Sequence, residues 1–327
     1  MFLSRTGALC ALLAATLVHA APRDSVPRPA DPFLDPKNDP YNPLRYIASN
    51  VLTAIAFTLV VVVGLAQSWM MRKWGAKFML PMVIGAFTFA LGIGTRFGLH
   101  SQPEAKGLYI VEYLFVVLSP CAFIAAEYVL LGRLARYLNC DKHLMVSPRR
   151  ITIVFISSDI TTFLVQAAGG GVSISSNTIA LAQTGSRIFL AGLVLQLASF
   201  LTFTCIFLVF IRRVRTLEPT IWAIGASKKW HEDWRTLAGA MFFSFIGILI
   251  RSAYRVAELS QGFNGYLATT EVFFYALDTL PLFIAIAIYV ACWPGRFIGD
   301  GTPPGTPPTV RKEASSIETV PAEQKES

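Results

Sequence analysis

"YIASNVLTAIAFTLVVVVGLAQSWM", residues 46–70, is the stretch that decides the fold class. It contains no Asp, Glu, Lys or Arg, and most of its side chains are apolar. A bilayer core about 30 Å thick is crossed by about 20 such residues in an α-helix, which satisfies every backbone amide within its own segment. The stretch therefore predicts a transmembrane helix.

The rest of the chain repeats this pattern. Of its 327 residues, 54% are hydrophobic and 15% are charged, whereas an ordinary soluble domain has about 25% charged residues. Further long, mostly apolar stretches occur at residues 78–97, 109–134, 151–168, 187–211, 237–257 and 271–293. Their length favours helices over strands. We therefore predict an all-α integral membrane protein whose seven transmembrane helices occupy residues 46–295.

Basic residues divide the connections between these stretches into two sets. The rich connections, with three, five, six and four Lys or Arg respectively, are residues 71–77, 132–150, 212–235 and the tail after 293. The poor connections are residues 98–108, with one Lys or Arg, and residues 169–186 and 258–270, with none. Because cationic loops stay on the cytosolic side, we predict that the N-terminus lies outside and the C-terminus in the cytosol.

Three segments outside the helical region have compositions of their own. Residues 1–21 combine Arg5, a short apolar run and small residues before Ala21, which is typical of a cleaved signal peptide; an uncleaved eighth span is the alternative. Residues 22–45 are rich in proline and lack apolar periodicity, so we expect an extended extracellular or lumenal segment. Residues 296–327 are rich in Pro, Thr, Ser and Glu, which predicts a disordered cytosolic tail.

The sixth and seventh predicted spans carry charged residues at Arg251, Arg255, Glu258, Glu271 and Asp278. The first three follow helical spacing and share one face, and the last two are two turns apart on a face of the next helix. A charge at the bilayer centre costs about 3 kcal/mol on insertion scales, so these side chains should face one another rather than lipid. We expect them to line a polar chamber open toward the outer leaflet. Structural ion pairs between the two helices are the alternative.

Two other spans carry polar residues at comparable positions. Asp159 and Gln166 are two turns apart on the fourth span and share a face. Asp159 should lie near mid-depth, so we expect it to face the same chamber. Glu127 lies nearer the cytosolic end of the third span, where we expect it to pair with Arg133 or to belong to an inner gate.

The sequence lacks the residues that several kinds of chemistry require. No Gly-x-x-x-x-Gly-Lys-Ser/Thr sequence occurs, so nothing indicates ATP-driven transport. None of the four histidines falls in a predicted span, which argues against an intramembrane zinc hydrolase, and no Ser or Cys has a spacing from His that suggests nucleophilic catalysis. The net charge of +8 is spread over short loops, where it sets topology rather than binding nucleic acid. We therefore expect no enzymatic activity, no cofactor, no metal and no nucleic-acid partner.

Five polar signatures follow one another along the predicted spans: "SPCAFIAAEYVLLGRLARYL" (119–138), "ITIVFISSDITTFLVQAAGGG" (151–171), "GSRIFLAGLVLQ" (185–196), "RSAYRVAE" (251–258) and "EVFFYALDTLP" (271–281). Over about residues 45–295 the chain resembles the fungal lipid-translocating exporter family, the RTA-like seven-transmembrane proteins. The resemblance implies a protein that moves or senses lipids such as sphingoid bases and phospholipids, and that is linked to resistance against toxic amphiphiles. The family's polar positions match Glu127, Asp159, Gln166, Gln196, Arg251, Arg255, Glu258, Glu271 and Asp278. The proline-rich N-terminal segment with its signal peptide departs from the family pattern.

The sequence thus favours a transporter of lipids or lipid-like amphiphiles, which holds a head group between charged helix faces while the tail stays in lipid. Arg251 and Arg255 would contact a phosphate or another anionic group. Asp159, Glu271 and Asp278 would attract an amino group or exchange protons. The expected partners are membrane lipids and the lipid-like substrate, and the pattern favours no particular oligomeric state.

A seven-helix lipid-sensing receptor without transport activity is the alternative function. Its topology would be the same, but no Asp-Arg-Tyr ends the third span and no Asn-Pro-x-x-Tyr occurs in the seventh. We expect the plasma membrane as the location, with an internal membrane as the alternative.

Overall fold

The computed structural model describes residues 31–39, 41–176, 178–226, 233–262 and 265–298. Within these ranges all regular secondary structure is helical. Seven helical segments are long and apolar enough to cross a membrane, which confirms the predicted all-α fold with seven transmembrane helices. The predicted signal peptide and most of the predicted cytosolic tail lie outside the described residues, and both stay predictions.

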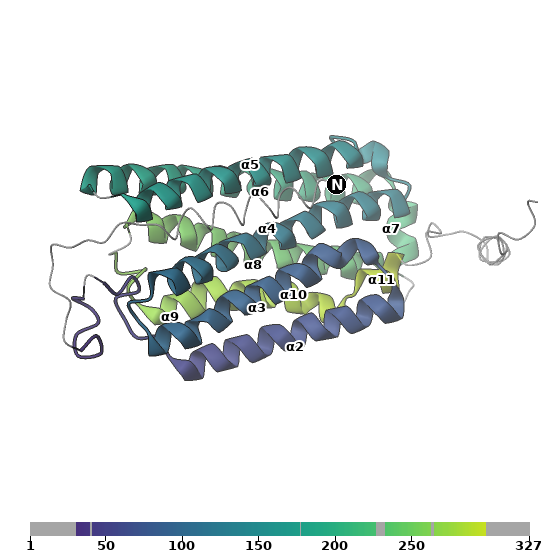
Figure 1. Ribbon diagram of the computed structural model, residues 1–327. Helices are drawn as coiled ribbons and strands as arrows, with labels where there is room; N and C mark the ends of the chain where they lie inside the picture. The colour runs from purple at the N-terminus through teal and green to yellow at the C-terminus, as the bar shows by residue number, and fades with distance from the viewer. Residues whose placement is uncertain (1–30, 40, 177, 227–232, 263–264, 299–327) are drawn as a thin grey trace, which may run out of the picture.

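Each span packs against the next one in the chain, and the last packs against the first, so the seven spans form a closed ring (Figure 1). The spans are α2 (Asn50–Trp74), η1 with α3 (Lys77–Met79, Leu80–Ser101), α4 (Lys106–Tyr137), α5 (Pro148–Ser175), α6 (Ile179–Leu217), α8 (Trp234–Ser260), and the composite of α9 (Glu271–Phe273), η3 (Phe274–Thr279) and α10 (Leu280–Ala291). Short helices occupy two connections, at η2 (Asp141–His143) and α7 (Pro219–Ala226), and α11 (Pro294–Ile298) follows the last span.

The fourth and fifth spans exceed their predicted lengths by the most. The predicted spans at 151–168 and 187–211 are the apolar middles of α5 and α6, and α6 alone has 39 residues. At 1.5 Å per residue α6 is roughly 58 Å long, which is about twice the thickness of a bilayer core. Much of the connection predicted at 169–186 is therefore helical, because the two helices continue to support each other beyond their apolar parts.

Glycines allow α5 and α6 to touch backbone to backbone. A Cβ atom added at Gly169 would lie 2.5 Å from the backbone nitrogen of Phe189, and one added at Gly185 would lie 2.4 Å from that of Ser173. Interfaces between membrane helices commonly use small residues in this way. The neighbouring Gly170 is different, since the nearest atom to an added Cβ is a ring carbon of Phe189 at an ordinary 3.4 Å.

We expect Gly169→Ala to lower the free energy of unfolding by about 1–3 kcal/mol, because the added methyl group meets backbone atoms that cannot move aside. Gly170→Ala is the matched control and should leave stability unchanged or raise it by up to about 1 kcal/mol through helix propensity. Thermal unfolding of the detergent-solubilised protein, followed by circular dichroism, measures both. Equal effects of the two substitutions would contradict the close α5–α6 contact.

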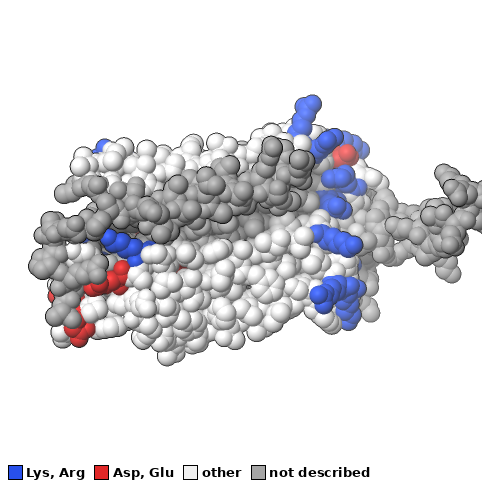
Figure 2. Space-filling model, viewed as in Figure 1, with Lys and Arg blue, Asp and Glu red and all other residues white. Residues whose placement is uncertain are grey.

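Exposed Lys and Arg gather at one end of the bundle, where α7 and α11 lie (Figure 2). We call this the basic end, and its exposed cations include Arg72, Lys73, Lys77, Arg136, Arg149, Arg150, Arg212, Arg213, Arg215 and Arg296. The middle of the visible face is almost free of charge (Figure 2). This distribution is the one that a positive-inside orientation requires.

Candidate functional site

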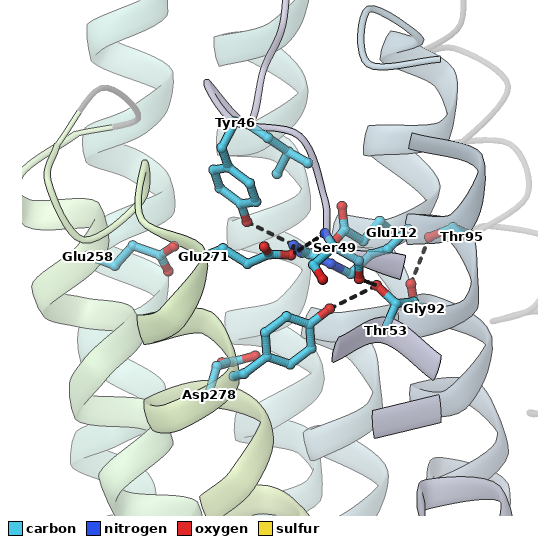
Figure 3. A network of polar contacts seen from close by, with 12 residues as sticks. Tyr46, Ser49, Thr53, Gly92, Thr95, Glu112, Glu258, Glu271 and Asp278 are labelled. Carbon is cyan, nitrogen blue, oxygen red and sulfur yellow. Dashed lines mark hydrogen bonds and ion pairs between the residues drawn. The ribbon is translucent and has the colours of Figure 1, made fainter. Parts of the chain in front are cut away.

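The first buried polar cluster is centred on Arg96, close to the end of α3 that lies opposite the basic end. The Nη1 atom of Arg96 donates to Glu112 Oε1 at 2.6 Å, and its Nη2 lies 3.2 Å from Glu271 Oε1. Nη2 also donates to the hydroxyl of Tyr46 at 2.9 Å. Burial raises the pKa of Tyr46 to about 12, so this phenol stays neutral. Tyr46, Glu112 and Glu271 converge on one point (Figure 3), and we call these four residues the Arg96 cluster.

The segment before α2 is held onto this cluster. The backbone N–H of Ser49, the N-cap residue of α2, donates to Glu271 Oε1 at 2.8 Å. One turn later the hydroxyl of Thr53 lies 2.9 Å from that of Tyr275 (Figure 3). The backbone carbonyl of Ala48 lies 2.7 Å from a ring nitrogen of His100 at the end of α3. The chain that enters α2 is thereby fixed across the ends of α3 and α9.

The second cluster surrounds Asp278, which is fully buried. Arg255 holds it with a two-pronged contact, from Nε to Oδ1 at 2.6 Å and from Nη2 to Oδ2 at 2.8 Å. Arg255 Nη1 also donates to Glu258 Oε2 at 2.9 Å. Arg251 Nε lies 3.1 Å from Asp278 Oδ1 as an ion pair without hydrogen-bond alignment, while its Nη2 donates to the carbonyl of Val116 on α4 at 2.7 Å. We call Asp278, Arg251, Arg255 and Glu258 the Asp278 cluster.

Asp278 lies within a turn of π-helix. The seventh span is α-helical at Glu271–Phe273, takes π geometry at Phe274–Thr279 and returns to an α-helix at Leu280. Pro281 follows directly; it has no N–H to donate, and its ring conflicts with the carbonyl four residues earlier in a regular α-helix. A widened turn relieves that conflict, and such turns are frequent at functional sites.

A cavity of about 50 Å³ lies between the two clusters. Its charged lining comes from Arg96, Glu112, Arg255 and Glu258, and the rest comes from Pro43, Leu44, Tyr46, Tyr109, Tyr113, Val116, Leu259, Gly262, Ala268 and Phe274. Two buried polar atoms on its lining residues, Glu112 Oε2 and Arg96 Nε, have no hydrogen-bond partner among the described residues. Buried polar atoms are usually satisfied, so these two atoms mark a place where a ligand or water can bind.

The two clusters unite the late-helix charges expected from sequence. Arg251, Arg255, Glu258 and Asp278 meet one another directly, and Glu271 joins the Arg96 cluster beside the same cavity. The charged side chains lie beside a cavity, as the predicted polar chamber requires. They also pair with one another, as the alternative of structural ion pairs between helices requires.

The polar residues of the fourth and fifth spans lie elsewhere. The hydroxyl of Tyr128 on α4 donates to Asp159 Oδ2 at 2.9 Å. Gln166 donates to Gln196 Oε1 at 2.8 Å, and Gln196 donates to the sulfur of Cys121 at 3.3 Å. None of these side chains lines the cavity, and no ion pair between described residues joins Asp159 to an arginine. They form a separate polar line among α4, α5 and α6.

The expected pair between Glu127 and Arg133 does not form. Glu127 is fully buried and accepts hydrogen bonds from Ser244 on α8 and Tyr289 on α10. Arg133 is exposed, and its guanidinium lies over the ring of Phe78 at 4.4 Å. The six-residue separation puts the two side chains on different faces of α4, because six residues are far from a whole number of helical turns.

Sequence reasoning left Arg96 and Glu112 out of the site. A signal was available, since Arg96 lies in the last two turns of α3 and Glu112 in the first two turns of α4, on either side of the short connection between these helices. Two antiparallel helices joined by a short connection bring such residues to the same depth. Among the described residues, no group of three or more His, Cys, Asp or Glu side chains is placed to hold a metal ion.

The fold and the site define a class: a seven-helix membrane protein with paired buried charges beside a small cavity at one end of the bundle. A family model described as RTA1 like protein matches residues 82–300, from α3 to just beyond α11. The chain belongs to this RTA1-like family, which confirms the resemblance seen in its polar signatures.

Named relatives come from Saccharomyces cerevisiae. Protein RTA1 is 30% identical over 216 residues, which are 66% of this chain and 65% of that protein, so the chain spans slightly less than two thirds of it. Protoporphyrin uptake protein 1 is 30% identical over 221 residues, covering 68% of this chain and 69% of the relative. Sphingoid long-chain base transporter RSB1 of strain YJM789 is 26% identical over 277 residues, covering 75% and 71%. No solved structure matches the chain.

Proposed function

We propose that this protein moves lipids or lipid-like amphiphiles across the membrane and that the cavity between the two clusters receives the polar head group. The observation that carries the proposal is the free oxygen of Glu112, a buried acceptor on a lining residue that no described residue satisfies. The similarity to a relative named as a sphingoid long-chain base transporter supports the same class of cargo. No enzymatic step is part of this proposal.

The charges around the cavity favour a cationic head group. The Arg96 and Asp278 clusters together hold four carboxyl groups against three guanidinium groups, so full ionisation leaves one negative charge. An ammonium group would balance that charge and could donate to Glu112 Oε2 and to Glu258. Sphingoid bases carry such an amino group, which makes them the preferred cargo of this proposal.

The size of the cavity limits what it can hold. One water-sized group needs roughly 10–15 Å³ of such volume, so about 50 Å³ accepts a few groups of that size. A head group fits and an acyl chain does not. We therefore propose that the tail stays among lipid chains while the head group enters between helices.

We further propose that the basic end faces the cytosol, because cationic connections are retained on the cytosolic side. We propose the plasma membrane as the location. The cavity then lies near the outer face, beneath the segment that enters α2. Asp159 lies deeper, and its Oδ1 is buried without a hydrogen-bond partner among the described residues. We propose Asp159, with Gln166 and Gln196 nearby, as a second contact for a head group during its passage.

Purified protein in liposomes provides the test. A fluorescent sphingoid base should cross protein-containing vesicles without any partner protein, whereas its N-acylated form should not, because acylation replaces the ammonium group with a neutral amide. Glu258→Gln should slow the free base by about fivefold, which corresponds to about 1 kcal/mol for one partly exposed charge contact. Glu218→Gln at the basic end, far from the cavity, is the matched control and should leave the rate unchanged.

Two outcomes would contradict the proposal. Vesicles that stay inert toward both lipids would favour the lipid-sensing receptor. Equal rates for the free base and its N-acylated form would show that the acidic cavity does not select the head group. Loss of transport in the Glu218→Gln control would mean that the Glu258 result reports general damage to the protein.

A further inference from the structure

Glu127 is a fully buried acidic residue that neither ionic cluster uses. It lies ten residues before the end of α4, roughly 15 Å from that helix end, in the half of the bundle nearer the basic end. Its exposed fraction is 0%. The salt bridges among the described residues do not include it.

Within the part of the chain that the structure describes, hydroxyl groups alone are hydrogen-bonded to its carboxyl group. Ser244 Oγ on α8 lies 2.6 Å from Oε1, and the hydroxyl of Tyr289 on α10 lies 2.8 Å from Oε1 and 2.6 Å from Oε2. The nearby core of α4, α8 and α10 is apolar and includes the fully buried Leu131, Ile248 and Ile286. Tyr289 is the one titratable side chain among the described residues that hydrogen-bonds to Glu127.

This environment disfavours a carboxylate. Moving an ionised carboxylate from water into a site without a cation is costly, whereas the neutral acid is tolerated when its oxygens are hydrogen-bonded. Proton counting agrees with the neutral form. Each hydroxyl has one proton, so if neither proton is shared, Ser244 and Tyr289 fill two of the three short contacts and a proton on the carboxyl group fills the third.

We infer that Glu127 is a proton-binding site and that its carboxyl group carries a bound proton in this conformation. Release of the proton requires Ser244 or Tyr289 to move away so that water or a base from the basic end can reach the carboxyl group. The site is separate from the outer cavity, since Ser244 precedes Arg251 by two helical turns and Tyr289 follows Asp278 by about three. The inference therefore holds whether or not a lipid is the cargo.

Infrared spectroscopy of the protein in lipid bilayers at neutral pH tests the inference directly. The difference spectrum between the natural protein and Glu127→Gln should show loss of the carbonyl band of a protonated carboxylic acid. Glu218→Gln is the matched control: that residue is ion-paired with Lys142 at 2.9 Å, and the Lys142 and His143 hydrogen bonds hold its pKa below the usual range, so the substitution should remove a carboxylate band instead.

Tyr289→Phe keeps the inference testable even if Glu127→Gln does not fold. Removing this hydroxyl leaves the carboxyl group in place but takes away a hydrogen bond, so the protonated band should remain and change frequency. Loss of a carboxylate band in Glu127→Gln would overturn the inference, because it would show that Glu127 is ionised. If Glu127→Gln does not fold, a protonated band that does not respond to Tyr289→Phe would overturn the inference, because that band would be assigned to another acid.

Discussion

Replacing Arg96 with methionine is expected to lower the free energy of unfolding by about 3–5 kcal/mol, which is the cost of breaking a buried ion pair by removing one partner. Glu112, whose side chain is only 5% exposed, and Glu271 would lose their shared cation, and Tyr46 would lose its donor. Polar contacts between membrane helices are worth about 0.6 kcal/mol on average. The larger expected effect arises because the substitution leaves a carboxyl group buried without a counter-charge.

A double variant separates that cost from simple loss of packing. Arg96→Met combined with Glu112→Gln removes both charges of the shortest pair, so it should recover part of the stability lost in Arg96→Met alone. Arg212→Met changes an exposed arginine at the basic end and should have little effect. Reversible unfolding in mixed detergent measures all three variants. If the double variant were no more stable than Arg96→Met, the Arg96–Glu112 pair would not be the source of the effect.

The second large effect is expected for Asp278→Asn, which should reduce sphingoid-base transport in liposomes at least about tenfold, equivalent to about 1.4 kcal/mol. Asp278 receives contacts from three arginine nitrogens. An amide cannot accept the two-pronged contact from Arg255, and it leaves Arg251 and Arg255 facing each other with only Glu258 as an acidic partner. Both arginines should then reorient, and Glu258, the acidic residue of this cluster that lines the cavity, should change its position.

Replacing Arg251, Arg255 and Asp278 together by apolar residues tests whether the charges of the Asp278 cluster serve transport or only stability. Buried ion pairs can often be replaced by well-packed apolar residues at little cost or with a gain in stability. The variant Arg251→Met, Arg255→Met, Asp278→Leu should therefore regain much of the stability that Asp278→Asn loses, yet it should not regain transport. Transport at the natural rate in this triple variant would show that the charges are structural and that the head group binds elsewhere.

The relatives and the geometry limit the cargo in different ways. Two relatives have names that refer to chemically distinct amphiphiles, a sphingoid base and a protoporphyrin. The cavity of this chain is lined by two guanidinium groups and two carboxyl groups, and the two clusters around it hold one carboxyl group more than guanidinium groups.

The sequence by itself determined the number and kind of the spans and the helix face on which some charges lie. Apolar stretches long enough to cross a bilayer require helices, because backbone groups cannot remain unsatisfied in lipid. The spacing of Arg251, Arg255 and Glu258 follows from helical geometry within one segment, and in the structure the three side chains do lie together around Asp278. Both inferences need only residues that are close in the sequence.

Only the tertiary structure decided which polar groups meet across helices. Glu127 faces Ser244 and Tyr289 rather than Arg133, which lies on another face of the same helix. Arg96 joins Glu112 and Glu271, which are 16 and 175 residues away. Such pairs depend on helix rotation and on which spans are neighbours in the ring, and these follow from side-chain packing over the whole bundle. Hydropathy and helical spacing carry no information about that packing.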